Sequence, residues 1–294
     1  LGMAIGIHLL TGLPLMAGVA ITILDTFLLL WLQKLGMRKM ELFIIGLISI
    51  ISISFLIEMI LVKPVMSEVV SGLVPSIPNE TALYIAIGII GATVMPHNLY
   101  LHSALVQTRK IRNDYAGKKK AIRMNVIDSA IALNLAFFVN AAILVLAAAA
   151  FHKTGQTDVA RIEDAHRLLD NLLGSKLAPT LFAIALIAAG QSSTITGTLA
   201  GQIVMEGYLQ LRINPWLRRL LTRLLAVVPA LLVIYYFGDG EVDAMLVLSQ
   251  VILSLQLGFA VIPLIHFVSD KEKMGDLRIK PYVAIAAWLV AAVL

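Results

Sequence analysis

The chain contains no cysteine, and only 14% of its 294 residues are charged. Without cysteine, a disulfide framework and a thiolate-bound metal centre are both excluded. Motifs typical of metalloproteases, serine hydrolases and phosphate-binding loops are also missing, which argues against a membrane enzyme. Soluble domains carry about 25% charged residues, whereas this chain is 59% hydrophobic with a mean hydropathy of +0.90. We therefore expect an all-α polytopic membrane protein that is not an enzyme.

Apolar segments alternate with short polar connections along the chain. After an apolar stretch at 1–10, the segments cover residues 13–32, 41–62, 82–107, 126–151, 178–208, 219–237, 244–268 and 281–294. Eighteen of the 23 Lys and Arg residues fall in alternate connections, at 33–40, 109–123, 209–223 and 270–280. This alternation follows the positive-inside rule, so we place the basic connections in the cytoplasm and expect segment 82–107 to run inward. The net charge of +5 has the same explanation and does not indicate a nucleic-acid partner.

Both ends of the chain look like parts of helices. Residues 1–10 are apolar without a basic start or a cleavage site, so they do not predict a signal peptide. Residues 281–294 are fewer than the roughly 20 needed to span a bilayer. We therefore expect the chain to be truncated at both ends. Between two segments, residues 158–173 carry apolar side chains at helical spacing and predict a short amphipathic helix outside the membrane.

The segment 82–107 is interrupted by Met95 and Pro96. Because proline has no amide hydrogen, the carbonyl of Ala92 loses its helical partner, and the residue before proline is disfavoured in the α region. We therefore predict a broken helix centred on Met95. At membrane depth, such a carbonyl is tolerated only where protein or a water-filled cavity receives it. A thioether beside it favours softer ions such as Mn²⁺, Fe²⁺, Co²⁺ or Cd²⁺ over Mg²⁺ and Ca²⁺.

The alternative interpretation is a plain proline kink with a methionine that only packs. His97 and His102, together with Asn98, add polar groups to the same apolar segment and favour a functional site. An unperturbed imidazole has a pKa of about 6.5, so the two histidines also permit proton chemistry.

Other polar groups in the apolar segments allow two interpretations. Small and hydroxyl side chains run through 190–202, where close helix packing through Gly197 and Gly201 is favoured. The alternative is a polar wall of a permeation path, which would include Ser193. In segment 244–268, Gln250 and Gln256 either complete the oxygen shell of an ion or bridge helices.

Charged residues inside the apolar segments are few. Arg223 lies near the start of segment 219–237, where snorkelling to the cytoplasmic surface is the favoured interpretation. Asp25 and Glu58 are expected to be interfacial.

Two stretches of the sequence resemble the Nramp family of divalent metal transporters. The first is residues 91–103, Gly-Ala-Thr-Val-Met-Pro-His-Asn-Leu-Tyr-Leu-His-Ser, and the second is residues 190–207, which end in Gln-Ile-Val-Met-Glu-Gly. The first motif is highly specific, and the resemblance runs through essentially the whole chain. It implies a leucine-transporter-type fold with two inverted five-helix repeats and a broken helix at Met95 and Pro96.

On that fold, residues 1–294 form a single transmembrane domain. The resemblance assigns residues 1–81 to the end of the first inverted repeat and residues 82–268 to the second. Residues 269–294 form a loop and part of a peripheral helix.

The resemblance also implies a metal site. The ligands of the family's broken sixth helix correspond to the Ala92 carbonyl and the Met95 sulfur. A glutamine of the tenth helix that approaches the ion corresponds to Gln250, with Gln256 as the alternative.

Proton transfer and gating are implied for three further residues. The histidines associated with these steps correspond to His97 and His102. The arginine of the proton exit path corresponds to Arg223. Ser193 and Asn98 remain candidates for a polar pathway.

One departure from the family pattern matters. The Asp-Pro-Gly-Asn element of the family's broken first helix is absent from this sequence, as are the acidic proton-route residues of the third helix. Since a carboxylate balances the charge of a dication, the chain alone is not expected to make a complete site. We interpret the absence as truncation.

The resulting hypothesis is a multi-pass symporter, in the cell membrane if the protein is bacterial, that imports Mn²⁺ or Fe²⁺ with protons. It needs no cofactor, and its expected partners are these ions and the lipid bilayer, with no nucleic acid. One alternative is a symporter of small organic solutes on the same fold. A second is a non-transporting membrane metal sensor or scaffold.

Overall fold

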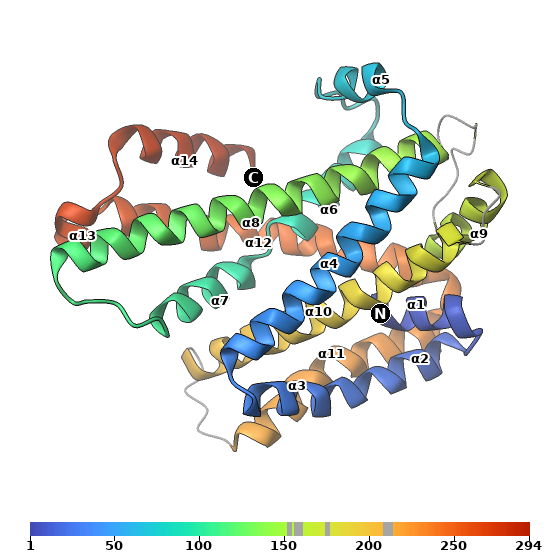
Figure 1. Cartoon of the computed structure of the whole chain (residues 1–294), viewed down its shortest axis with the longest axis horizontal. Helices are drawn as coiled ribbons and strands as arrows, with labels where there is room; N and C mark the ends of the chain where they lie inside the picture. The colour runs from blue at the N-terminus through green and yellow to red at the C-terminus, as the bar shows by residue number, and fades with distance from the viewer. Residues whose placement is uncertain (152–154, 156–160, 174–176, 208–213) are drawn as a thin grey trace. The chain divides into compact units, whose positions relative to one another are not determined.

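The computed structural model (Figure 1) describes residues 1–151, 155, 161–173, 177–207 and 214–294. The chain divides into two compact units. Unit 1 comprises residues 1–75 and 130–243, and unit 2 comprises residues 76–129 and 244–294. The assignment of the chain to two inverted repeats stays a prediction.

Unit 1 holds helices from the start and the middle of the chain. They are α1 (Gly2–Thr11), α2 (Leu15–Ile21), the 3₁₀ helix η1 (Thr22–Leu24), α3 (Asp25–Lys34), α4 (Met37–Val62), α5 (Met66–Ser71), the second part of α8 (Tyr115–Ala150), α9 (Ile162–Leu173), α10 (Leu177–Gly207), α11 (Pro215–Phe237) and the 3₁₀ helix η3 (Asp239–Glu241).

Unit 2 holds the remaining helices. They are α6 (Glu80–Thr93), α7 (Pro96–Gln107), the first part of α8, nearly all of α12 (Val242–Ser269), α13 (Lys271–Met274), the 3₁₀ helix η4 (Gly275–Leu277) and α14 (Pro281–Val293).

Six helical stretches of the described chain are long and apolar enough to cross a membrane. They are Arg38–Val62, Glu80–Gln107, Tyr115–Ala150, Leu177–Gly207, Leu220–Phe237 and Asp239–Ser269. These stretches coincide with six of the predicted segments and confirm an all-α polytopic membrane protein. The predicted segment 13–32 is instead divided into α2, η1 and α3, and 281–294 forms the short helix α14.

Helix α10 is the centre of unit 1, with α1 and α4 packed beside it (Figure 1). Small side chains let these neighbours approach, since Ala183, Ala185 and Ala188 are all buried. The approach to α1 is closest at Gly190, where a Cβ atom would lie 2.5 Å from the amide nitrogen of Met3. Any larger residue at 190 would therefore push α1 away.

The expected packing through Gly197 and Gly201 is only half right. A Cβ atom at Gly201 would lie 2.7 Å from Cγ2 of Thr222 on α11, so this glycine does permit a close contact. A Cβ atom at Gly197 would meet nothing within 4 Å. Gly197 therefore faces open space, which favours the alternative of a polar wall.

Helix α9 is the predicted amphipathic helix, beginning at Ile162; residues 158–160 lie outside the described residues. Leu169 is 1% exposed and packs against Ala150 and Ala178. The amide of Ile162 donates to Oδ2 of Asp243 at 3.1 Å, which satisfies a free N–H at the helix start. Helix α9 is therefore fixed within unit 1 to the end of α8, the start of α10 and the first turn of α12.

Candidate functional site

The break in the helix 80–107 falls where the sequence predicts it. Helix α6 ends at Thr93, and α7 begins at Pro96, where the missing N–H of proline is tolerated. Met95 between them is extended, with φ −85° and ψ 124°. The amide of Asn98 donates to the Met95 carbonyl at 3.1 Å, so the thioether is the donor that this residue can offer an ion. Because Pro96 has no amide hydrogen, it donates no helical hydrogen bond to the carbonyl of Ala92, four residues earlier.

The end of α6 is pressed against α12 within unit 2. A Cβ atom at Gly91 would overlap the backbone carbonyl of Gln250 and would lie 2.8 Å from the amide nitrogen of Ser254. Only glycine allows two helix backbones to come this close. The contact lies one helical turn before Met95, so it brings α12 to the broken part of the helix.

The side chain of Gln250 has an unused acceptor at this contact. Its Nε2 donates to Oγ of Ser249 at 3.2 Å, whereas its buried Oε1 has no partner within the described part of the chain. A buried amide oxygen without a partner costs free energy, and an incoming cation would satisfy it. Gln256 is exposed, and the structure does not bring it to this contact.

The two predicted histidines lie on α7 in different surroundings. His97 directly follows the break and is half-buried, whereas His102 is exposed. Nε2 of His102 lies 3.2 Å from Nδ2 of Asn125 on α8. Asn98 is exposed. The side chain of His97 is therefore the better shielded of the two from solvent.

The donor set around the break is electrically neutral, being a carbonyl, a thioether and an amide. Among the described residues, there is no group of three or more His, Asp or Glu side chains that could hold a metal ion. Such neutral donors suit an ion that binds and then leaves again better than a permanently bound metal.

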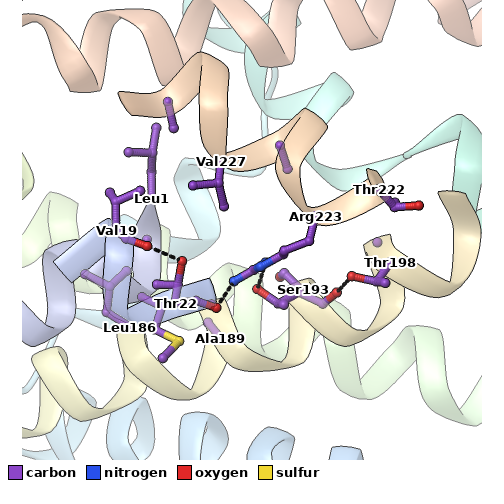
Figure 2. Close-up of a pocket in the computed structure, with 17 residues that line it drawn as sticks. Leu1, Val19, Thr22, Leu186, Ala189, Ser193, Thr198, Thr222, Arg223 and Val227 are labelled. Carbon is purple, nitrogen blue, oxygen red and sulfur yellow. Dashed lines mark hydrogen bonds between the residues drawn. The ribbon is translucent and has the colours of Figure 1, made fainter. Parts of the chain in front are cut away.

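A second cluster of polar residues lies in unit 1 around Arg223 of α11. The guanidinium donates through Nη2 to the carbonyl of Thr22 at 2.5 Å and to Oδ2 of Asp25 at 3.3 Å. Through Nη1 it donates to Oγ1 of Thr194 at 3.3 Å. Figure 2 shows Arg223 reaching from α11 towards Thr22. The Arg223 side chain is only 8% exposed, so the expectation that it snorkels to the cytoplasmic surface is wrong.

Asp25 is the residue of this cluster that sequence reasoning missed. It is 7% exposed, not interfacial as expected, and its carboxylate forms an ion pair with Arg223. With its amide nitrogen turned towards Asp25, Gln191 donates to both carboxylate oxygens, at 2.9 and 3.3 Å. The 3₁₀ turn η1 precedes Asp25 directly and presents the Thr22 carbonyl to the guanidinium. Mid-helix 3₁₀ turns often mark functional hinges.

The Arg223 cluster borders a cavity of about 510 Å³ within unit 1 (Figure 2). Ser193, Thr194, Gly197 and Thr198 of α10 line it, so the polar-wall interpretation of this stretch agrees with the geometry. Ser193 is among these residues, and its part in a polar pathway stays a prediction. The cavity is large enough for several water molecules, each of which occupies about 30 Å³ in the liquid.

Glu58 on α4 is the second acidic residue that the sequence placed wrongly. It is 0% exposed, and neither carboxylate oxygen has a hydrogen-bond partner in the described chain. Its neighbours in sequence, Phe55 and Met59, belong to an apolar cluster with α8 and α10. An ionised carboxylate without a partner is unfavourable in such surroundings, which favour the neutral form of the Glu58 carboxyl group.

Comparison with known proteins finds relatives along the whole chain. The family model for natural resistance-associated macrophage protein-like sequences matches residues 1–294. The chain is 52% identical over 297 residues to the divalent metal cation transporter MntH of Agrobacterium fabrum and 53% identical over 294 residues to that of Listeria innocua. The alignments cover 100% and 99% of this chain but 64% and 66% of those proteins. The chain therefore spans slightly less than two thirds of the length of these relatives.

Solved structures show the same likeness. The manganese transporter of Eremococcus coleocola, in complex with an aromatic bis-isothiourea substituted compound, has a TM-score of 0.88 at 38% identity. The match covers 100% of this chain and 65% of that one. A variant of the same transporter gives a TM-score of 0.86 at 37% identity. These matches confirm the predicted fold class.

Proposed function

The chain belongs to the natural resistance-associated macrophage protein (Nramp) family, and on that basis we propose that the protein is a secondary transporter of divalent transition-metal ions such as Mn²⁺ and Fe²⁺. It carries them towards the cytoplasm together with protons. The observation that carries this proposal is the break between α6 and α7, where a carbonyl and a thioether lie beside the closest contact with α12. The names of the relatives, a divalent metal cation transporter and a manganese transporter, support it.

The metal is recognised by donors of mixed softness. Oxygens of Ala92 and Gln250 bind any divalent ion, whereas the sulfur of Met95 binds transition ions better than Ca²⁺ or Mg²⁺. Because none of these donors is charged, their attraction for the dication is moderate and release remains possible. A site built from a discontinuous helix near the middle of the bilayer is also the usual arrangement in secondary transporters.

Protons take part through groups that the metal does not need. His97 follows the break directly and changes its charge near neutral pH when unperturbed. In unit 1, Arg223 lines a cavity large enough for several water molecules, and the carboxylate of Asp25 pairs with its guanidinium. Such a wall conducts protons along water without leaving a bare charge in lipid.

The experiment that tests the proposal uses the natural protein in proteoliposomes loaded with a metal-quenched dye and a pH dye. We expect acid-driven Mn²⁺ entry accompanied by acidification of the lumen. In the Met95→Ala variant, Mn²⁺ entry should survive better than Cd²⁺ entry, and Ca²⁺ should begin to compete. Met66→Ala, which removes an exposed methionine from α5, is the matched control and should change neither.

Two results would contradict the proposal. Metal binding without flux would indicate a sensor or scaffold, and uptake of amino acids in place of metals would indicate an organic-solute symporter. Equal exclusion of Ca²⁺ by the Met95→Ala variant and the parent would remove the sulfur from the selectivity mechanism.

A further inference from the structure

The connection between α7 and α8 in unit 2 forms a small basic pocket. The pocket has a volume of about 330 Å³ and lies wholly within residues 106–125. Its charged lining residues are all basic: Arg109, Lys110, Arg112 and Lys120. A cavity lined by charges of one sign attracts ions of the opposite sign.

The four basic residues are not equivalent. Nη2 of Arg109 lies 2.9 Å from the carboxylate of Asp128, and Nη2 of Arg112 lies 3.4 Å from that of Asp114. These two arginines are therefore partly neutralised by their own partners. The attraction for an anion has to come from the other two basic side chains of the lining.

Lys110 and Lys120 carry the uncompensated charge. Neither of them forms an ion pair within the described residues, and both are exposed to an incoming ligand. Burying or pairing these ammonium groups against an anion would therefore not break an existing contact.

Gly117, which also lines the pocket, is tightly packed. Its amide donates to Oδ1 of Asp114 at 3.1 Å, and Oδ2 of the same carboxylate lies 3.4 Å from Nη2 of Arg112, so Asp114 is paired with Arg112 and not with either lysine. A Cβ atom at Gly117 would lie 2.6 Å from both Cβ and the carbonyl oxygen of Arg112. The pocket therefore keeps its shape because position 117 is glycine.

Apolar side chains share the same pocket. Ile111 and Met124 line it and are largely exposed, although both are large and hydrophobic. The pocket also lies between the ends of two membrane-spanning stretches, at Gln107 and Tyr115. Exposed apolar side chains beside lysines at the end of a spanning helix are typical of the membrane–water interface.

From these observations we propose that the pocket binds the phosphate-bearing headgroup of an anionic phospholipid. Lys110 and Lys120 contact the phosphate, and Ile111 and Met124 contact the glycerol backbone and the first methylenes of the acyl chains. Free inorganic phosphate offers the same charge but no apolar part, so it uses only half of this surface. The proposal concerns lipid binding and does not depend on metal transport.

The test measures thermal unfolding of the natural protein in a neutral detergent during titration with short-chain phosphatidylglycerol. Phosphatidylcholine and inorganic phosphate are titrated separately. A ligand that binds the folded state raises the unfolding temperature, and the concentration dependence gives an apparent Kd. We expect phosphatidylglycerol to stabilise the parent at lower concentration than either of the other two.

Three double variants locate the site. Lys110→Gln with Lys120→Gln should weaken phosphatidylglycerol binding by about fivefold per lysine, or about 25-fold together. Lys118→Gln with Lys119→Gln is the matched control, because these lysines carry the same charge and precede Lys120 on α8 but do not line the pocket. Lys110→Arg with Lys120→Arg keeps the charges and should keep binding, which guards against a loss that arises from misfolding.

Several outcomes would overturn the proposal. Equal loss in the pocket variant and in the control variant would mean diffuse surface attraction. Inorganic phosphate acting as strongly as phosphatidylglycerol would make the ligand a free anion, and equal stabilisation by phosphatidylcholine would remove the role of charge.

Discussion

Replacing Gly91 by alanine should disturb both the stability of the protein and its metal site. A Cβ atom at this position overlaps the backbone of α12 at Gln250 and lies 2.8 Å from the amide nitrogen of Ser254. Neither neighbour is the end of a flexible side chain, so the two helices have to move apart. Because Ala92 and Met95 follow Gly91 closely in the chain and Gln250 lies on α12, this movement separates the proposed metal donors.

Gly88 offers a matched control on the same helix and against the same partner. A Cβ atom there would lie 3.6 Å from side-chain methyl groups of Val247 and Val251, which is ordinary contact. Glycine to alanine in a helix gains about 1 kcal/mol from helix propensity, and this gain is similar in both variants. The difference between the two variants therefore isolates the backbone overlap, for which overpacking costs about 1–3 kcal/mol.

The assay is thermal or denaturant unfolding of the parent, Gly88→Ala and Gly91→Ala proteins, together with Mn²⁺ titration calorimetry. Gly88→Ala should match or exceed the parent in stability and bind Mn²⁺ normally. Gly91→Ala should be about 1–3 kcal/mol less stable than Gly88→Ala. It should also bind Mn²⁺ at least about tenfold more weakly, since ligand positions need to be held within about 0.5 Å. If the two variants unfold and bind metal alike, the close α6–α12 contact does not hold the site together.

Three further substitutions test the charged and titratable groups. Asp25→Asn should destabilise the protein by about 3–5 kcal/mol in unfolding measurements, because it leaves the buried Arg223 without a counter-charge. Adding Arg223→Gln should recover most of this loss. If the double variant shows no recovery, the two side chains act separately. Glu58→Gln should change the unfolding free energy by less than about 1 kcal/mol, since it replaces a neutral carboxyl group by an amide of the same size. A loss of stability as large as that of Asp25→Asn would show that Glu58 is ionised. His97→Ala should reduce proton entry per Mn²⁺ in the two-dye proteoliposome assay more than it reduces Mn²⁺ binding, and unchanged acid-driven uptake would exclude His97 from the coupling.

The break at Met95 could be predicted from the sequence because its cause is local. Proline lacks an amide hydrogen wherever it stands, so the effect on Ala92 and Met95 follows from covalent structure alone. The alternation of basic connections likewise reflects the membrane and not the packing of the chain. These two features gave the number of main spans and the position of the broken one.

The environment of Arg223 could not be predicted in the same way. Its partner Asp25 is 198 residues away in sequence, and the two meet only because α10 and α11 pack beside the start of α3. The signal that was available was Asp25 itself, a carboxylate inside the apolar segment 13–32. A charge at that depth requires a partner, and a buried arginine is the type of partner it finds.

Helix packing motifs were a weaker guide than expected. The spacing of Gly197 and Gly201 suggested a close contact at both positions, yet only Gly201 makes one, and further tight approaches occur at Gly190 and Gly91. A glycine permits close approach only on the face that a neighbour covers, and the sequence spacing does not show which face that is.

The two kinds of chemistry in the described chain are divided between the two units. The buried charged residues, Asp25, Glu58 and Arg223, all lie in unit 1, whereas the donors at the break belong to unit 2 and are neutral. A dication held by neutral donors keeps its full charge, which is unfavourable in a medium of low dielectric constant. A counter-charge for the metal therefore has to come from a carboxylate outside the donor set at the break, as the Asp-Pro-Gly-Asn element of the family would provide.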